Sequence, residues 1–221
     1  MANISIYDGI QTFNSRDKNC EIIVSHNDLI DQIFLMYESN KKITVLDHAC
    51  YDKPAPMFPL GYSGVEESLC AHSDLYSILC NDMRDYFRYN AKHKNNGLYL
   101  DRGFYIENLD FTYNNQSLTV DVVGATAPNY NYGRRYHKFN QQENSVALFN
   151  RIDFLLSVAA KNKVDLLIVG PFGCSVYGQD ITEVASIFKE LLTNKYRHCF
   201  EKVCFNTTYE AFYQEANRIL S

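Results

Sequence analysis

Short apolar runs alternate with stretches of helical periodicity along the chain. Six segments have the length and apolar content of strands. They are residues 20–24, 43–49, 97–109, 117–127, 164–170 and 200–205. Residues 97–109 and 117–127 are close enough in sequence to form adjacent strands. Residues 164–170 are almost uniformly apolar, which is typical of a parallel strand covered on both faces.

Apolar residues recur at helical spacing between most of these strands. The pattern predicts helices over residues 29–36, 65–79, 146–159, 181–192 and 207–220. Ser25 with Asp28, and Thr207 with Glu210, have the spacing of capping boxes that would open the first and last of these helices. Strands that alternate with helices imply βαβ units. We therefore expect one α/β domain over residues 1–221, with a mixed or parallel sheet and helices on both faces.

Composition narrows the class of protein. Of the 221 residues, 46% are hydrophobic and 21% are charged, which excludes a disordered chain. The net charge of −5 disfavours a duplex-binding protein, so we expect no sequence-specific binding of nucleic acid. No apolar run approaches the ~18 residues of a membrane span, and the first residues lack a signal-peptide pattern. We expect a cytoplasmic protein that meets no membrane.

Residues 170–180, GPFGCSVYGQD, join a predicted buried strand to a helix. Glycines in such a turn permit left-handed backbone and close approach to a ligand. Successive amides there can form a nest for an anion, assisted by the following helix N-terminus. The alternative is a glycine-rich turn that only links the two elements. The segment matches neither the dinucleotide fingerprint nor the P-loop.

Glu66 and Glu67 stand together at the start of a predicted helix, after a proline- and glycine-rich loop. Adjacent acids at such a place are commonly surface residues favoured by the helix dipole. Neighbouring helical residues point about 100° apart, so one of them can instead face the cleft at the strand ends. A carboxyl group in that cleft could have a raised pKa and act as a general acid.

Two further candidates are weaker. His48 with Cys50, and Cys70 with His72, supply soft metal ligands, but their spacing is not that of a zinc site. The seven cysteines form no CxxC pair and no readable pairing with histidine, so we expect buried free thiols, no metal and no cofactor. Residues 128–140 interleave basic residues with tyrosines. They are either an exposed loop or a surface that stacks on a nucleobase, such as a lid over a nucleotide bound at 170–180.

Three segments together resemble a known family. They are VLDHACYDKPAPMFPLGYSGVEESLCAHSDLYSIL at 45–79, VDVVGATAPN at 120–129 and VDLLIVGPFGCSVYGQDITEVASIFKELL at 164–192. Their order and spacing resemble the microbial-type poly(ADP-ribose) glycohydrolase domain, a branch of the macrodomain superfamily. The resemblance spans about residues 20–195 and implies a three-layer α/β/α fold that binds ADP-ribose.

The resemblance also assigns roles. It implies that Glu67 is the catalytic acid and that Glu66 orients the ribose hydroxyls. Residues 170–178 match the second diphosphate loop of the family, and Tyr177 stands where a ring lies against the distal ribose. The residues implied at the ligand are Asp47, Ala127, Pro128, Asn129, Gly170, Phe172, Gly173, Cys174, Ser175, Val176, Tyr177 and Gly178.

The sequence departs from the family pattern at three points. The first diphosphate loop of the family is a run of glycines, and Ala55, Pro56 and Met57 stand there in this chain. Proline lacks an N–H donor and cannot reach a positive φ, so this loop must be rebuilt. Val65 replaces a Gln, and Ser175 replaces a Gly in the second loop.

These observations predict an ADP-ribosyl glycohydrolase that acts by carboxylate general acid–base catalysis. Its partner would be ADP-ribose attached to a polymer or to a modified target, and we expect it to be a monomer. The alternative is a non-catalytic domain that binds or sequesters ADP-ribose or a related signalling nucleotide. Retention of both Glu66 and Glu67 favours the enzyme, because a binding protein would not need both acids.

Overall fold

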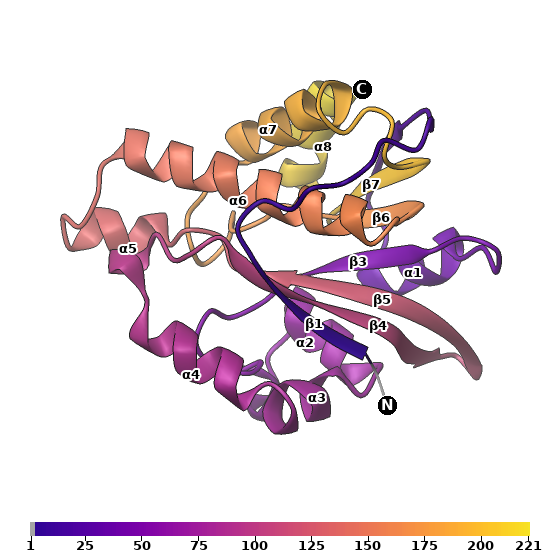
Figure 1. The fold of residues 1–221 in the computed structure, drawn as a ribbon, viewed down its shortest axis with the longest axis horizontal. Coiled ribbons are helices and arrows are strands. Elements are labelled where there is room, and N and C mark those ends of the chain that lie inside the picture. The colour runs from indigo at the N-terminus through magenta and orange to yellow at the C-terminus, as the bar shows by residue number, and fades with distance from the viewer. Residues whose placement is uncertain (1–2) are drawn as a thin grey trace.

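The computed structural model describes residues 3–221, which form a seven-stranded sheet in the order β1-β4-β5-β3-β6-β7-β2 (Figure 1). The strands are β1 (Asn3–Asp8), β2 (Glu21–Ser25), β3 (Ile43–His48), β4 (Arg102–Tyr113), β5 (Gln116–Ala125), β6 (Leu166–Val169) and β7 (Lys202–Asn206). Strands β5, β3, β6, β7 and β2 run parallel, while β4 and β1 add an antiparallel edge. The expected mixed sheet is confirmed.

Helices cover both faces of this sheet. They are α1 (Leu29–Met36), α2 (Val65–Ala71), α3 (Leu75–Asn81), α4 (Arg84–Lys92), α5 (Tyr130–Arg135), α6 (Gln141–Lys161), α7 (Ile181–Thr193) and α8 (Glu210–Leu220), with short 3-10 turns at Phe58–Leu60 and Asn95–Gly97. Helices α6, α7 and α8 pack in one hydrophobic cluster, and α1 to α4 pack in the other. The expected three-layer α/β/α architecture is therefore confirmed.

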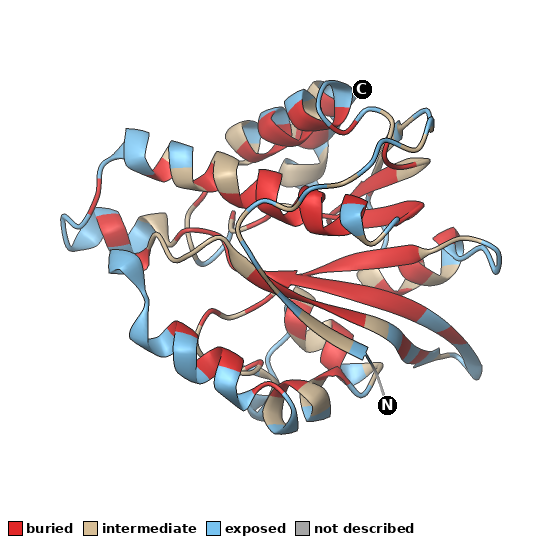
Figure 2. Cartoon of the chain, in the orientation of Figure 1, coloured by how far each residue is buried: buried red, intermediate tan, exposed pale blue. Residues whose placement is uncertain are grey.

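Successive side chains of a strand point to opposite faces of the sheet. Because helices cover both faces, the central strands are buried on both. In β3, Val45 belongs to the cluster under α1 to α4, and Leu46 belongs to the cluster under α6 to α8. Figure 2 shows these strands almost entirely buried, between helices whose outer faces are exposed. Strands β6 and β7 consequently show no polar alternation, and the polar residues of β7, Lys202 and Asn206, stand at its two ends.

Several local predictions need correction. The helix expected over 65–79 is divided into α2 and α3, because Ser73 pairs with Phe111 of β4 between them. The closing helix begins at Glu210 without a capping box, since the Thr207 hydroxyl accepts from the Tyr209 amide instead. At α1 the cap is Asp28 alone, which accepts from the Ile30 amide.

Three elements were not predicted. The edge strand β1 pairs antiparallel with β4, and α4 covers the sheet below that edge. Residues 128–140, expected to be a loop, contain the six-residue helix α5, which Asn129 caps by accepting from the Tyr132 amide. Within residues 3–221 no helix has both the length and the apolar character needed to cross a membrane.

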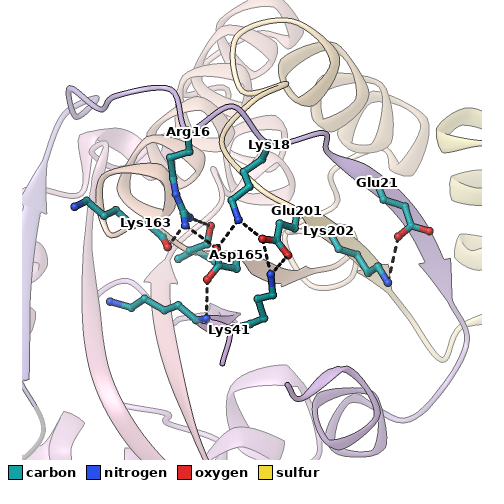
Figure 3. Close-up of polar contacts among 10 residues, drawn as sticks. Arg16, Lys18, Glu21, Lys41, Lys163, Asp165, Glu201 and Lys202 are labelled. Atoms are coloured by element: carbon teal, nitrogen blue, oxygen red, sulfur yellow. Dashed lines mark hydrogen bonds and ion pairs between the residues drawn. The ribbon is translucent and has the colours of Figure 1, made fainter. Parts of the chain in front are cut away.

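Charged side chains cluster at the amino ends of β6 and β7 (Figure 3). Asp165 accepts from Arg16 at 2.7 Å and from the Lys42 amide at 2.9 Å. Glu201 accepts from both Lys18 and Lys41. These contacts fasten the segment that precedes β2 to the edge of the sheet where β6 and β7 begin.

Candidate active site

A cleft of about 760 Å³ opens at the opposite edge, where the parallel strands end. Its walls follow the order of the strands. Ala127 follows β5. His48 ends β3 and is followed by residues 49–50, residues 170–173 and 175–177 follow β6, and Asn206 ends β7 ahead of residues 207–209. The first turn of α2 and the loop before it form the remaining wall. Ligand sites of open α/β sheets lie at this edge.

Two carboxyl groups are buried beside this cleft without full hydrogen bonding. Asp47, near the end of β3, is fully buried, and Glu66, in the first turn of α2, is 5% exposed. Among the described residues, neither carboxyl oxygen of Asp47 and only one of Glu66 finds a partner. That one, Oε2, accepts from the Cys50 amide at 3.3 Å. Such orphaned buried groups are uncommon in native proteins and each needs an explanation.

Burial also changes the acidity of these groups. It raises the pKa of Asp47 above its ordinary value, and the charge of Glu67 raises it further. Burial likewise raises the pKa of Glu66, with the charge of Asp47 as the next cause. The pair therefore retains protons at pH values where exposed carboxyl groups have lost theirs.

Glu67 differs from its neighbour because it is only partly buried and lines the cleft directly. Its side chain folds back over Gly64, so that a Cβ added at Gly64 would lie 2.4 Å from Glu67 Oε2. The backbone of Gly64 is extended, with φ −172°. This glycine is therefore needed for space and not for its conformational freedom. Both acids predicted for catalysis line the cleft. Glu66 is buried, and Glu67 is only partly buried.

The loop at 170–178 forms the wall opposite α2. It is held in shape by its own backbone, because the amides of Phe172, Cys174 and Gly178 donate within it. In the described chain, the consecutive amides of Ser175, Val176 and Tyr177 donate to no backbone carbonyl. Three free successive amides on a cleft wall are the donors that an anion-binding nest requires.

Packing explains one glycine of this loop. Gly173 has φ +78°, and a Cβ there would lie 2.5 Å from Cβ of Ala127. Gln179 ties the end of the loop to its surroundings, since its Nε2 donates to the Pro128 carbonyl at 2.7 Å and to Asn144 Oδ1 at 2.9 Å. The loop is thus fixed against the end of β5 and against α6.

In the first loop no glycine stands at positions 55–57, as the sequence shows. Ala55 is buried with φ +33°, and its carbonyl accepts from the Phe58 amide to open a 3-10 turn. Pro56, Met57 and Tyr62 line the cleft from this loop. Side chains therefore take the place of an amide cradle on this side of the cleft.

The structure brings together most of the residues predicted at the ligand. Those that line the cleft are Ala127, Gly170, Phe172, Gly173, Ser175, Val176 and Tyr177. Asp47 lies behind the cleft surface, and Pro128, Asn129, Cys174 and Gly178 do not line it. Pro128 receives the hydrogen bond of Gln179, and Asn129 caps α5, so these two position the neighbouring loop and helix.

Sequence reasoning missed the far end of the cleft. Asp28 after β2 and Asn206, Tyr209 and Phe212 after β7 line it there. The side chain of Tyr209 is 61% exposed at the rim, and Asn206 Oδ1 is buried with no partner in the described chain. These residues follow strand ends, so knowledge that β2 pairs with β7 would have identified them.

His48 was predicted only as a candidate metal ligand and not as part of the cleft wall. It lines the floor of the cleft, edge-on to Phe172 with ring centroids 5.5 Å apart. Burial lowers its pKa to about 4, so its ring is neutral at physiological pH. Among the described residues no group of three potential metal ligands forms, although His48 and Cys50 both line the cleft.

The fold and the cleft define an α/β/α domain with a nucleotide-sized site at the strand ends, lined by three successive amides that have no backbone acceptor and by an acidic cluster. A family model described as microbial-type PARG, catalytic domain, matches residues 1–111, and the chain belongs to this family. PARG abbreviates poly(ADP-ribose) glycohydrolase.

Solved structures of poly(ADP-ribose) glycohydrolases share this fold. Poly(ADP-ribose) glycohydrolase from Thermomonospora curvata superposes with a TM-score of 0.86 at 20% identity, covering 97% of this chain and 85% of that one. The enzyme from Deinococcus radiodurans in complex with ADP-ribose gives 0.85 at 23% identity, covering 93% and 86%. A search of curated proteins found no match.

Proposed function

We propose that this protein is an ADP-ribosyl glycohydrolase that hydrolyses the glycosidic bond of ADP-ribose in a polymer or on a modified target. The observation that carries the proposal is the acidic cluster of Asp47, Glu66 and Glu67 across the cleft from the free amides of 175–177. Family membership supports it, as does the ADP-ribose bound to the relative from Deinococcus radiodurans. We take the chain to act as a single domain and a monomer, without metal or cofactor.

The ligand would lie along the strand ends. Its diphosphate accepts from the amides of Ser175, Val176 and Tyr177, and its distal ribose faces the acidic cluster. The adenine then extends toward the end formed by β7 and β2, where Tyr209 and Phe212 offer aromatic faces and Asp28 offers an acceptor. The buried oxygens of Asp47 and Glu66, orphaned in the described chain, would gain ribose hydroxyls as partners.

The reaction breaks the bond between the anomeric carbon of the distal ribose and the leaving atom, which is an oxygen in the polymer. Protonated Glu67 gives its proton to that atom as oxocarbenium character develops on the ribose. The resulting Glu67 carboxylate then takes a proton from the water that attacks the anomeric carbon. Glu66 holds the ribose hydroxyls in position. General acid–base help of this kind contributes on the order of 10² to 10⁴ in rate.

The test is Glu67→Gln, which keeps the size of the side chain and removes its proton transfer. We expect turnover of labelled poly(ADP-ribose) to fall by about 10² to 10⁴, with thermal stabilisation by ADP-ribose retained. Asp85→Asn, at a side chain 94% exposed on α4, is the matched control and should turn over normally. Turnover of Glu67→Gln at the wild-type rate would contradict the assigned mechanism.

The linkage is tested with three ligands offered in parallel, namely labelled polymer, mono-ADP-ribosylated protein and free ADP-ribose. Release of ADP-ribose from the polymer, from the modified protein or from both identifies the bond that is cleaved. Stabilisation by ADP-ribose with no release from either substrate would establish a binding protein and overturn the proposal.

A further inference from the structure

The stretch that joins α4 to β4 has an unusual backbone. Four of its residues have a positive φ, namely Asn95 at +43°, Asn96 at +54°, Gly97 at +97° and Tyr99 at +61°. Glycine adopts this left-handed conformation freely and asparagine tolerates it, but for a bulky residue such as tyrosine it is an outlier. Strain of this kind persists only where the surrounding structure holds it, and it is enriched at functional sites. Tyr99 is therefore the residue of this stretch that needs an explanation.

Hydrogen bonds hold the strained stretch from two sides. The Gly97 carbonyl accepts from the Asn129 amide, at the start of α5, at 2.8 Å. Buried Arg151 of α6 donates to the Leu98 carbonyl at 3.2 Å and to Asp101 Oδ1 at 2.9 Å. Figure 1 shows the chain rising from α4 to the side of α5 before it enters β4. The backbone around Tyr99 is thus fixed between α5 and α6.

The ring of Tyr99 is stacked on a second tyrosine that is firmly held. Tyr51 is 1% exposed, and its ring lies nearly parallel to that of Tyr99, with centroids 4.2 Å apart and an interplanar angle of 17°. The Tyr51 hydroxyl donates to the His93 carbonyl at 2.8 Å, and the Tyr51 carbonyl accepts from Asn90 Nδ2 at 2.8 Å. This stack gives the side chain of Tyr99 a rigid support.

Tyr99 also contacts a residue of the cleft wall. Its ring centroid lies 6.2 Å from that of Tyr177, with an interplanar angle of 54°. Burial raises the pKa of Tyr177, and Tyr99 raises it further through its charge and through a hydrogen bond between the two side chains. Tyr177 lines the cleft, whereas Tyr51 and Tyr99 do not. Tyr99 can therefore act on a ligand through Tyr177 and not by direct contact.

We propose that Tyr99 is a positioning residue, which holds the ring of Tyr177 in the orientation that the distal ribose requires. The proposal rests on the proposed function, in which this ribose lies beside Tyr177 and faces Glu67. A Tyr177 ring that could turn freely would let the ribose shift relative to the carboxyl group of Glu67. A misplacement of about 1 Å at a reacting centre can cost about 10² in rate. The strain at Tyr99 is then the cost of presenting its ring to Tyr177.

The test is a double-mutant cycle on kcat for release of ADP-ribose from labelled poly(ADP-ribose). Tyr99→Asn removes the ring without straining the turn further, because asparagine tolerates a positive φ. We expect it to lower kcat about tenfold and to change KM by less than about twofold. Tyr177→Leu should lower kcat at least as much. The double variant should be no slower than Tyr177→Leu alone, because Tyr99 then has no ring to position.

Two further variants separate positioning from folding. Tyr99→Phe keeps the ring stacked on Tyr51 and loses only the hydroxyl, so it should retain about half of kcat, and adding Tyr177→Phe should lower kcat no further. This second cycle decides the question if Tyr99→Asn does not fold, which circular dichroism shows. Tyr89→Leu is the matched control, since it removes a ring of α4 that stacks on His93 at 4.0 Å and does not line the cleft. It should keep the wild-type kcat.

Additive losses in the cycle would overturn the positioning role, since Tyr99 would then act independently of Tyr177. An unchanged kcat of folded Tyr99→Asn would overturn it as well, and so would an equal loss in Tyr89→Leu. Failure of the proposed function has a different signature. Absence of ADP-ribose release by the wild-type protein rejects the glycohydrolase, whereas release by the wild type together with an additive cycle rejects only the role of Tyr99.

Discussion

At the amino ends of β6 and β7, Asp165 and Glu201 lie among Arg16, Lys18 and Lys41 and are fully hydrogen-bonded. At the carboxyl end of β3, Asp47 and Glu66 lie among no cations, and in the described chain three of their four oxygens have no partner. The two groups lie at opposite edges of the same sheet, and only the first has hydrogen-bonded partners that hold neighbouring segments together. Uncompensated burial costs stability, and the proposed function assigns ribose hydroxyls as the missing partners at this edge.

The largest difference between the two edges is expected when an aspartate is replaced by asparagine at each of them. Asp165→Asn removes the charge that Arg16 faces and should lower the free energy of unfolding by about 1.5–3 kcal/mol. Asp47→Asn should leave that free energy unchanged or raise it, because it removes a carboxyl group that cannot be charged cheaply. Chemical denaturation at pH 8 measures both. A larger loss for Asp47→Asn than for Asp165→Asn would contradict the comparison.

The pH dependence of the free energy of unfolding sharpens the comparison of the two edges, because folding raises carboxyl pKa values at one edge and lowers one at the other. Folding raises the pKa values of Asp47 and Glu66 above their unfolded values of 3.8 and 4.5. Their contribution to the free energy of unfolding is therefore fully present below those unfolded values and is lost as pH rises through the folded values. Hydrogen bonds from Lys18 and Lys41 lower the pKa of Glu201 to about 2. Its contribution is therefore present above pH 4.5 and is lost as pH falls toward 2.

Two variants separate the acid and the alkaline decline of the free energy of unfolding, which is measured by denaturation at a series of pH values from acid to alkaline. Asp47→Asn/Glu66→Gln should flatten the alkaline decline, whose slope is at most about 1.4 kcal/mol per pH unit for each group. Glu201→Gln should flatten only the acid decline. The assignment is refuted if the first variant changes the acid decline instead.

The smallest effect is expected from a methyl group. Gly64→Ala places a Cβ against Glu67 Oε2, so we expect turnover to fall about tenfold through displacement of this flexible carboxylate, with stability changed by less than about 1 kcal/mol. Gly61→Ala is the matched control, since its φ of +74° strains an alanine while nothing lies within 4 Å of the added atom. It should lose about 1 kcal/mol or more of stability and keep its turnover. Equal effects of the two changes on turnover would contradict the inference that Gly64 is needed to leave space for Glu67.

Burial pattern determined which elements the sequence could predict. Strands such as 164–170 have an uninterrupted apolar run, and α7 has a clear helical period, so both were predicted close to their true bounds. The edge strand β1 is only partly buried, with apolar residues at alternate positions over six residues, and gave too weak a pattern. The break between α2 and α3 could not be predicted, because the apolar period continues through it and the cause is the pairing of Ser73 with a distant strand.

The candidate site was predicted on the elements that the family resemblance covers. Glu66, Glu67 and the turn at 170–178 were placed at the strand ends in advance, and all three reach the cleft. Asp28, Tyr209 and Phe212 were missed because they face the cleft only through the pairing of β2 with β7, which no local pattern encodes. Burial of Glu66 but not Glu67 also depends on packing of α2 against β3, and this could not be derived from two identical adjacent residues.

The hydrogen bonds of Gln179 have a consequence for the thermodynamics of recognition. By joining Pro128, at the end of β5, to Asn144 in α6, this buried side chain holds residues 173–178 in place before any ligand arrives. Ordering a mobile loop of that length would cost conformational entropy at the moment of association. In this protein the loop is ordered during folding, so a diphosphate bound there as proposed would encounter a preorganised receptor.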